Sequence, residues 1–282
     1  MYIFIYIMNI LITGSSGYLG RFILENINRE EYNNIICIIS SEKRYKENEF
    51  LYKNCKIYKG DIGERDFIKT IFSENKIDYV IHAAAMKYID TCEKFQQNCI
   101  NTNITGTLNI CYFSKKYNVT NVLTISTDKA NNPGCLYGIS KLASERITIS
   151  HGFSVYQGVN FWNSDGSFLQ KWKTSISNKK EIILYNKEHI RYFSEPNKTA
   201  YEILKLIKIN NNKVNYPEEC WKIKIFDVFN ILKNKYKNCN FIIESSEENS
   251  FDKIEEKINE VTKVKDINKE KLIELLDYIF NY

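Results

Sequence analysis

Short apolar runs alternate with longer amphipathic segments over the first half of the chain. The segments between the runs have helical spacing, and a further strand is predicted at 153–156. This is the rhythm of βαβ units, so the pattern predicts an α/β fold with a Rossmann-type, doubly wound parallel sheet. The runs are nearly all apolar, as strands covered on both faces must be, and they fall at 10–13, 35–40, 56–59, 79–82 and 122–126.

Beyond residue 152 this rhythm weakens into irregular segments rich in Asn, Lys and Glu. We therefore expect a boundary there, with residues 1–152 forming the Rossmann domain and residues 153–282 a smaller C-terminal lobe. The last strand of the sheet, near 153–157, is the exception.

The sequence predicts two amphipathic helices, one between the fourth and fifth strands and one near the end of the chain. The first buries one stripe against the sheet, at Ile100, Ile104, Leu108 and Cys111. The second lies at 271–280 and docks through Leu272, Leu275, Leu276 and Ile279.

The N-terminal apolar stretch, residues 2–12, is β-branched and aromatic. It is shorter than the roughly 20 residues that a membrane-spanning helix needs, so we expect a strand and no membrane partner. Strand and turn can begin equally well from Met8, which leaves Met1 and Met8 both open as starts. The first seven residues are then an extension of little structural weight.

Composition excludes several classes of protein. With 44% hydrophobic and 26% charged residues in 282, the chain is a folded globular protein. Its net charge of +5 comes from basic residues interleaved with acidic ones, so no nucleic-acid partner is expected. The eight cysteines form no C-x-x-C pair, so we expect buried reduced thiols, a cytoplasmic protein and no metal site.

A glycine-rich turn follows the first strand directly and precedes a helical run. In this context the backbone N–H groups and the helix N-terminus bind a pyrophosphate, which predicts a dinucleotide site. The spacing G-x-x-G-x-x-G resembles that of extended short-chain dehydrogenases. The turn runs from Gly14 to Gly20, and the residues expected at the cofactor are Gly14, Ser15, Ser16, Gly17, Tyr18 and Leu19.

The end of the second strand carries Ser40 and Ser41 where NAD-specific sites place a carboxylate. With Lys43 and Arg44 beyond, a 2′-phosphate meets hydroxyls and cations, which favours NADP. If Lys43 and Arg44 are instead a solvated surface pair, NAD remains open.

Two later segments are placed to contact the same cofactor. After the third strand, Asp61 and Ile62 lie where adenine is expected. After the fourth strand, Ala83, Ala84 and Ala85 allow the backbone to approach the cofactor closely.

The fifth strand ends in a polar cluster, Thr127, Asp128 and Lys129, and Tyr137 and Lys141 open the next helix. Residues four apart share a helix face, so the Lys141 ammonium can lower the pKa of the Tyr137 phenol and hold the nicotinamide ribose. These five residues are the predicted catalytic group.

The chain resembles the inverting UDP-N-acetylglucosamine 4,6-dehydratases, extended short-chain dehydrogenases of polysaccharide biosynthesis. The resemblance spans about residues 9–142 and rests on the Ser126–Ala130 segment, Pro133, Tyr137-Gly138 and Lys141. The Asp-Lys pair is its discriminating part, because retaining hexose dehydratases carry Asp-Glu there. Two further blocks, 82–87 and 103–106, are similar to family blocks. The resemblance places Lys87 at cofactor and substrate, and Asn103, Asn160 and Arg191 at the UDP-sugar.

This resemblance implies a redox-neutral dehydration. Tyr137 takes the C4 hydroxyl proton while hydride leaves C4, and Thr127 holds that hydroxyl. Lys129 then removes the C5 proton while Asp128 protonates the departing C6 hydroxyl. Hydride returns to C6 and C5 is inverted, which gives a 4-keto-6-deoxy sugar.

The chain departs from the family at Gln157-Gly158-Val159, where an Arg-Tyr-Gly stretch is usual before Asn160. Two alternatives follow: a UDP-sugar 4-epimerase or reductase, or a non-catalytic NADP-binding protein with a degenerate substrate lobe. Arg191 matches a diphosphate-binding position, and its alternative is a surface charge. We also expect a homo-oligomer.

Overall fold

The structure is a computed structural model that describes residues 8–244, 255 and 258–281, so the N-terminal extension expected at residues 1–7 lies outside it. The chain divides into two units. The first comprises residues up to Gly158 together with Pro196–Tyr216, and the second comprises Val159–Glu195 and the residues from Pro217 onward. The strand near 153–157 lies with the first unit, as expected, but residues 196–216 also lie there, whereas we expected them in the C-terminal lobe.

A parallel sheet forms the centre of the first unit. Its order is β10-β6-β5-β4-β1-β2-β3, and every neighbouring pair is parallel. The order reverses beside β1, which is the doubly wound arrangement that the sequence predicted, and this fold prediction is confirmed. The strands are β1 (Met8–Thr13), β2 (Tyr32–Ile39), β3 (Cys55–Lys59), β4 (Tyr79–His82), β5 (Asn121–Thr127), β6 (Ser154–Gly158) and β10 (Val214–Asn215).

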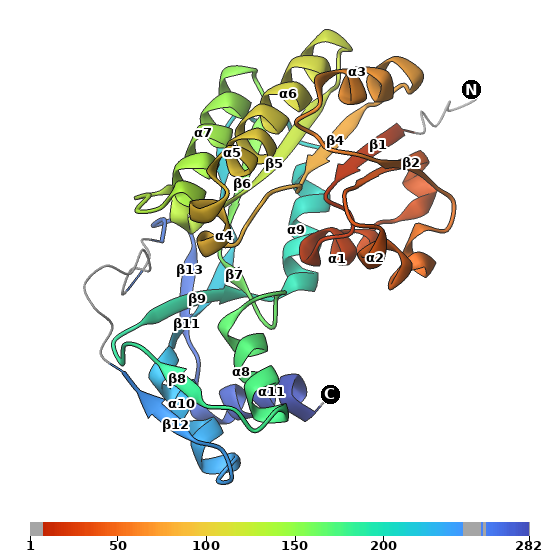
Figure 1. Cartoon of the computed structure of the whole chain (residues 1–282). Helices are drawn as coiled ribbons and strands as arrows, with labels where there is room; N and C mark the ends of the chain where they lie inside the picture. Colours follow the sequence, from red (N-terminus) through yellow and green to blue (C-terminus); the bar gives the residue numbers. More distant parts are fainter. Residues whose placement is uncertain (1–7, 245–254, 256–257, 282) are drawn as a thin grey trace, which may run out of the picture. The chain divides into compact units, whose positions relative to one another are not determined.

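Helices cover this sheet, with α3, α6 and α7 packed side by side and α1 packed against α9 (Figure 1). A core cluster that includes Leu11, Phe72 and Phe113 fills the space under α3 and α6. The helices of this unit are α1 (Tyr18–Asn26), α2 (Glu42–Lys46), α3 (Arg65–Glu74), α4 (Ile89–Lys94), α5 (Gln96–Cys99), α6 (Gly106–Lys116), α7 (Leu136–Ser150) and α9 (Pro196–Leu206).

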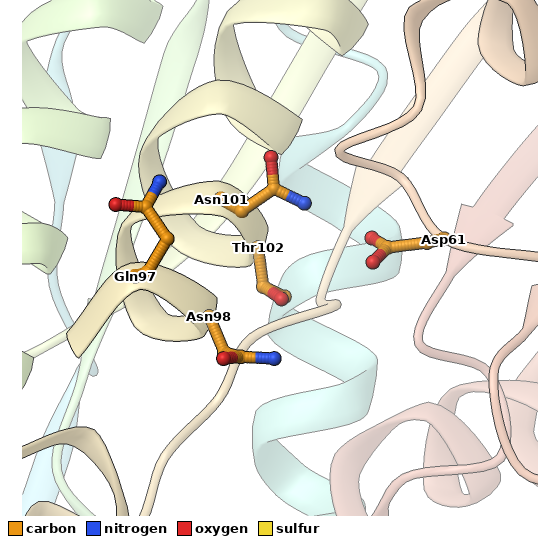
Figure 2. Close-up of a pocket in the computed structure, with 5 residues that line it drawn as sticks. All are labelled: Asp61, Gln97, Asn98, Asn101 and Thr102. Carbon is orange, nitrogen blue, oxygen red and sulfur yellow. The ribbon is translucent and has the colours of Figure 1, made fainter. Parts of the chain in front are cut away.

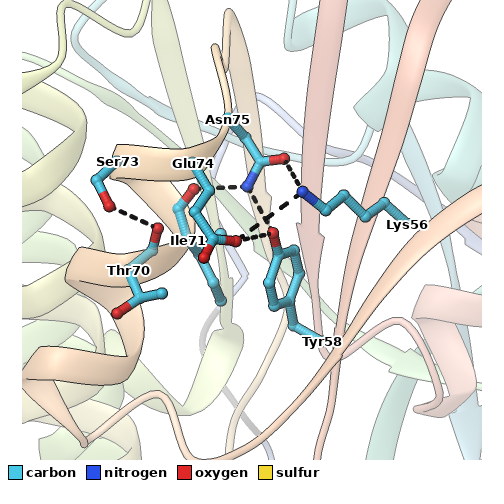
Figure 3. Close-up of polar contacts among 7 residues, drawn as sticks. All are labelled: Lys56, Tyr58, Thr70, Ile71, Ser73, Glu74 and Asn75. Atoms are coloured by element: carbon cyan, nitrogen blue, oxygen red, sulfur yellow. Dashed lines mark hydrogen bonds and ion pairs between the residues drawn. The ribbon is translucent and has the colours of Figure 1, made fainter.

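Strand β3 is less buried than the sequence predicted. It lies at the edge of the sheet, and its two lysines are exposed. Polar contacts to the end of α3 take the place of a second covering layer (Figure 3). The Tyr58 hydroxyl donates to Glu74 Oε2 at 2.8 Å, and Lys56 Nζ donates to Asn75 Oδ1 at 2.9 Å. The prediction that this strand is covered on both faces is therefore wrong.

The predicted stripe at 100–111 is also wrong at Ile100 and Leu108, whereas Ile104 is half-buried and Cys111 is buried. A π-helical turn, η3 (Ile100–Thr105), precedes α6, and it leaves Ile100 36% exposed and Leu108 42% exposed. The wider turn breaks the regular helical spacing on which the prediction rested. Asn103 and Thr107 are buried instead, because hydrogen bonds satisfy their polar atoms.

A buried polar network joins the sheet to these helices. His82 lies between Thr13 Oγ1, 2.8 Å from Nδ1, and Thr107 Oγ1, 3.0 Å from Nε2. Thr107 and Ser144 both donate to the carbonyl oxygen of Asn103. Strands β1 and β4 are thus tied to η3, α6 and α7 at the carboxyl edge of the sheet.

The second unit has its own sheets and core. One sheet has the order β13-β11-β9-β7, and the other pairs β12 with β8. Trp162 stacks on Phe193 with ring centroids 4.3 Å apart, inside a cluster that includes Trp172 and Phe229. The elements are β7 (Asn160–Phe161), α8 (Phe168–Ser177), β8 (Ile182–Leu184), β9 (Ile190–Ser194), β11 (Glu219–Lys224), α10 (Ile225–Lys235), β12 (Phe241–Ile243), β13 (Lys263–Asp266) and α11 (Lys269–Asn281).

The predicted terminal helix is confirmed as α11, which buries Leu272, Leu276 and Ile279 in this core. Among the eight cysteines, Cys55 and Cys239 are half-buried and the other six are buried. None of the helices in the described part of the chain has the length and apolar character needed to cross a membrane.

His82 makes the stability of the fold depend on pH. Burial, and to a lesser extent the charge of Lys141, lower its pKa from 6.5 to about 3, so the folded chain keeps it neutral. The unfolded chain binds a proton below about pH 6.5, so stability falls as the pH drops through that value. Between about pH 7 and about pH 5 the loss is about 2 kcal/mol.

Urea unfolding of wild type and His82→Gln across that range measures this term. The variant should lose about 2 kcal/mol less than wild type, whereas the control His151→Gln, at the end of α7, should follow wild type. An equal pH slope in all three proteins would show that His82 is not the group responsible.

Candidate active site

The glycine-rich turn lies between β1 and α1 and packs against the segment that follows β4. Gly14 has φ +67°, and a Cβ atom there would lie 2.6 Å from the backbone nitrogen of Ala84. Any side chain at this position would collide with that segment. Glycine therefore brings the turn and residues 83–85 together at the carboxyl edge of the sheet.

The start of α1 offers backbone groups. Gly17 is its N-cap, no side chain caps it, and its first turn holds no acidic residue. Ser15 and Leu19 are buried, and Ser15 Oγ donates to the Ile38 carbonyl at 3.5 Å. The side chains of Ser15 and Leu19 therefore turn inward, and the N–H groups are what a phosphate would meet. This cradle fits a pyrophosphate.

The segment after β2 carries two neighbouring cations, Lys43 and Arg44, which differ in their exposure and their contacts. Lys43 lies 4.0 Å from Glu47, and its side chain is 87% exposed. The guanidinium of Arg44 makes no hydrogen bond or ion pair with any described residue, and Arg44 is half-buried. Of the predicted ribose-phosphate contacts, Ser40 is exposed and Ser41 Oγ accepts from the Arg44 backbone nitrogen as the cap of α2.

A small polar pocket of about 160 Å³ lies beside Asp61 (Figure 2). Asp61 lies opposite four residues of α5 and η3 that the sequence reasoning missed, although an uncharged, amide-rich stretch marks them. Ile62 is buried and packs against Gly106, and its carbonyl oxygen accepts from Asn109 Nδ2 at 3.1 Å. The pocket is lined by Asp61, Gln97, Asn98, Asn101 and Thr102.

Asn103 has a different role from the substrate contact that we expected. It is 1% exposed, its Oδ1 accepts from the Met86 nitrogen at 2.7 Å, and its Nδ2 donates to the Met86 oxygen and to Ser140 Oγ. Its amide is fully used inside the first unit. Asn103 therefore fixes the 83–87 segment, whose Lys87 is half-buried, against α7.

The cluster after β5 is a buried ion pair. Asp128 and Lys129 lie in the 3₁₀ turn η4 (Asp128–Ala130), with Lys129 Nζ 3.3 Å from Asp128 Oδ1. Thr127 Oγ1 donates to the same oxygen at 2.8 Å. Asp128 is 2% exposed, and its Oδ2 has no hydrogen-bond partner among the described residues. A buried oxygen in this state needs a donor, which a bound ligand or a proton can supply.

Tyr137 and Lys141 lie one turn apart on α7, as predicted, but their electrostatics differ from the prediction. Burial and the Asp128 carboxylate raise the pKa of Tyr137 well above its usual value, against a hydrogen bond with Thr127 that lowers it. Lys141 Nζ donates to the Ile125 carbonyl at 2.5 Å, and burial lowers its pKa to about 8. The expectation that Lys141 lowers the pKa of the phenol is therefore wrong for this structure, because burial and Asp128 dominate.

Two predicted substrate contacts belong to the second unit. Asn160 Nδ2 donates to the Tyr192 carbonyl at 3.0 Å, and β7 pairs with β9 there. Arg191 is 7% exposed, and its Nη1 donates to the Ile190 carbonyl at 2.7 Å. The alternative that Arg191 is only a surface charge is therefore wrong. Within the described residues no group of three or more His, Cys, Asp and Glu side chains could hold a metal ion.

Comparison with known proteins points to one family. Residues 10–240 match the model of a family described as polysaccharide biosynthesis protein. An inverting UDP-N-acetylglucosamine 4,6-dehydratase of Campylobacter jejuni is 31% identical over 66% of this chain and 59% of its own length. The resemblance that the sequence motifs indicated is confirmed.

Other relatives are more varied. An uncharacterised membrane protein of Methanocaldococcus jannaschii is 32% identical over 70% of this chain and 62% of its own length. A UDP-glucose 4-epimerase of Rickettsia massiliae is 30% identical over 65% and 58%. The chain thus spans less than two thirds of the length of these curated relatives.

The fold comparison agrees. The solved UDP-glucose 4-epimerase of Thermotoga maritima superposes with a TM-score of 0.79 at 19% identity, over 97% of this chain and 99% of that one. At this identity the likeness shows the fold.

Substitutions at the two members of the Asp128–Lys129 ion pair should destabilise the chain by different amounts. Lys129→Met leaves a buried carboxylate without its ion-pair partner, so the free energy of unfolding should fall by about 3 kcal/mol at neutral pH. Asp128→Asn should cost less, because the lysine stem can carry its ammonium toward water.

A urea double-mutant cycle checks this. Asp128→Asn combined with Lys129→Met should restore most of the stability that Lys129→Met loses. Additive losses in the double variant would contradict the ion pair.

Proposed function

We propose that this chain, which belongs to the polysaccharide biosynthesis protein family, is a nucleotide-sugar 4,6-dehydratase. The proposed substrate is UDP-N-acetylglucosamine, and the product is a 4-keto-6-deoxy sugar with C5 inverted. The observation that carries the proposal is the contact of Lys129 with Asp128 beside Tyr137. A relative 31% identical, named as an inverting dehydratase of this substrate, supports it.

Tyr137 and Lys141 of α7, together with Thr127, serve the oxidation and reduction steps. A bound nicotinamide would supply the hydride acceptor for C4 and the hydride donor for C6. Tyr137 takes the proton of the C4 hydroxyl, which Thr127 holds by hydrogen bonding. Burial and the Asp128 carboxylate hold the proton on Tyr137, and the hydrogen bond with Thr127 acts in the opposite direction.

The ion pair explains how one short contact supplies both an acid and a base. Moving one proton from Lys129 to Asp128 across 3.3 Å leaves a neutral amine and a carboxylic acid. The amine removes the C5 proton, which the C4 ketone has made acidic, and the acid protonates the departing C6 hydroxyl. Water leaves, and Lys129 and Asp128 are again an ammonium and a carboxylate.

Incubation with UDP-N-acetylglucosamine in deuterated water tests this directly. We expect a product lighter by one water and carrying deuterium at C5. Lys129→Met should lower the rate of elimination by about a thousandfold while cofactor affinity stays close to wild type. The matched control Lys116→Met, an exposed lysine on α6, should keep full activity.

Failure to dehydrate any of several UDP-sugars would contradict the proposed dehydratase activity. C4 epimerisation, which the Rickettsia massiliae relative makes the second candidate, keeps the C6 oxygen and leaves the mass unchanged. Tight cofactor binding without saturable UDP-sugar binding would indicate the non-catalytic alternative.

The proposed cofactor is NADP. The glycine cradle fits a pyrophosphate, and the Arg44 guanidinium has no partner among the described residues, so it can take a 2′-phosphate. Arg44→Gln should weaken NADP binding about tenfold and leave NAD binding unchanged, because one charge-assisted contact is lost. Calorimetry with both nucleotides measures this, and Lys43→Gln is the matched control.

An equal effect of Arg44→Gln on NADP and NAD would contradict this choice of cofactor. We further propose Lys87, Asn160 and Arg191 as substrate contacts, and a cytoplasmic homo-oligomer as the working form.

A further inference from the structure

Glu145 is a buried carboxylate on α7 that the proposed chemistry does not use. It is 6% exposed and follows Lys141, itself 4% exposed, by one helical turn. No lysine, arginine or histidine of the described residues lies within 4.0 Å of its oxygens. A buried carboxylate without an ion-pair partner is costly, so its retention needs a physical reason.

Its hydrogen-bond partner is an uncharged amide. Gln157 Nε2, at the end of β6, donates to Glu145 Oε1 at 2.9 Å, and Gln157 is 4% exposed. The amide fixes the carboxylate and satisfies one lone pair, but it leaves the negative charge in place. An arginine at this position would instead cancel that charge.

The charge acts on Lys141. Lys141 Nζ donates to the Ile125 carbonyl at 2.5 Å. Burial disfavours its ammonium and lowers the lysine pKa, whereas the charge of Glu145 raises it. The resulting pKa of Lys141 is about 8. In a site shielded from water, a single negative charge one turn away has a large effect.

We infer that Glu145, held in place by Gln157, is a positioning residue that keeps Lys141 protonated at neutral pH and so sets the upper pH limit of cofactor binding and oxidation. The last clause rests on the proposed function. The effect on the lysine itself does not.

The elements packed around α7, and α7 itself, carry other titratable groups, and these are common to every variant below. They are His82 on β4, Cys92 and Glu93 on α4, Cys99 on α5, Asp128 and Lys129 on η4, and Tyr137 on α7 itself. Of these, Cys99 also raises the Lys141 pKa, after Glu145.

The direct experiment follows the Cε resonance of Lys141 by NMR in the full chain labelled with ¹³C at lysine Cε, with the signal assigned from Lys141→Arg. No cofactor or sugar is needed. The wild-type signal should titrate near pH 8, and Glu145→Gln should move the midpoint down by about one unit or more. Glu145→Asp should restore part of the shift.

The matched control is Glu202→Gln. Glu202 is also a buried carboxylate, and it accepts from the hydroxyl of Tyr156, next to Gln157 in β6, at 2.7 Å. This variant should leave the Lys141 midpoint unchanged. Gln157→Arg, which keeps the carboxylate but adds a cation, should lower the midpoint as Glu145→Gln does and covers the case in which Glu145→Gln does not fold.

Identical Lys141 titration in wild type and the folded variants would overturn the inference. The functional clause is tested by NADPH binding against pH. At a pH between the two midpoints, Glu145→Gln should bind up to about tenfold more weakly than wild type. If Glu145→Gln shifts the Lys141 midpoint but the wild-type chain binds no NADPH, the proposed function and the pH limit on cofactor binding both fail. The effect of Glu145 on Lys141 would still stand, so the two failures are distinguishable.

Discussion

The buried hydrogen bonds of His82 are the constraint on which the rest of the first unit depends. A neutral imidazole between Thr13 and Thr107 joins the carboxyl ends of β1 and β4 to α6. Because an unsatisfied buried polar group costs more free energy than a typical hydrogen bond gains, few alternative placements of these elements are tolerable. Asn103 extends the constraint by holding the 83–87 segment against α7. The glycine turn and the Tyr137 helix therefore meet at one edge of the sheet.

Two lysines and two carboxylates at that edge are arranged in two different ways. Lys129 and Asp128 are in contact at 3.3 Å, which is the geometry in which a proton can move between them. Lys141 and Glu145 are separated by a helical turn, and each is hydrogen-bonded elsewhere, to Ile125 and to Gln157. In that arrangement the carboxylate holds the lysine charge without sharing its proton. Contact distance thus separates the proposed acid–base pair from the proposed charge-holding pair.

Much of the fold could be predicted from the sequence because buried residues recur at regular spacing along strands and helices. Central strands such as β1 and β4 are buried and mostly apolar, and every predicted strand of the parallel sheet forms with ends shifted by only a few residues. The same logic failed where polar bonding replaced apolar packing. Strand β3 is tied to α3 by Tyr58 and Lys56 at the open edge. The π turn of η3 places Asn103 in the interior and Leu108 outside.

The sequence by itself determined the doubly wound sheet, the glycine turn and the presence of the Thr-Asp-Lys and Tyr-Lys groups, because each is encoded by local spacing along one strand or one helix. Only the tertiary structure decided the partners of those groups. It buried Arg191, turned Gln157 toward Glu145, and raised the pKa of Tyr137 where the helix spacing alone favoured a lower one. Burial and charge depend on what the rest of the chain places around a side chain, and contacts between distant residues such as Glu145 and Gln157 leave no periodic trace in the sequence.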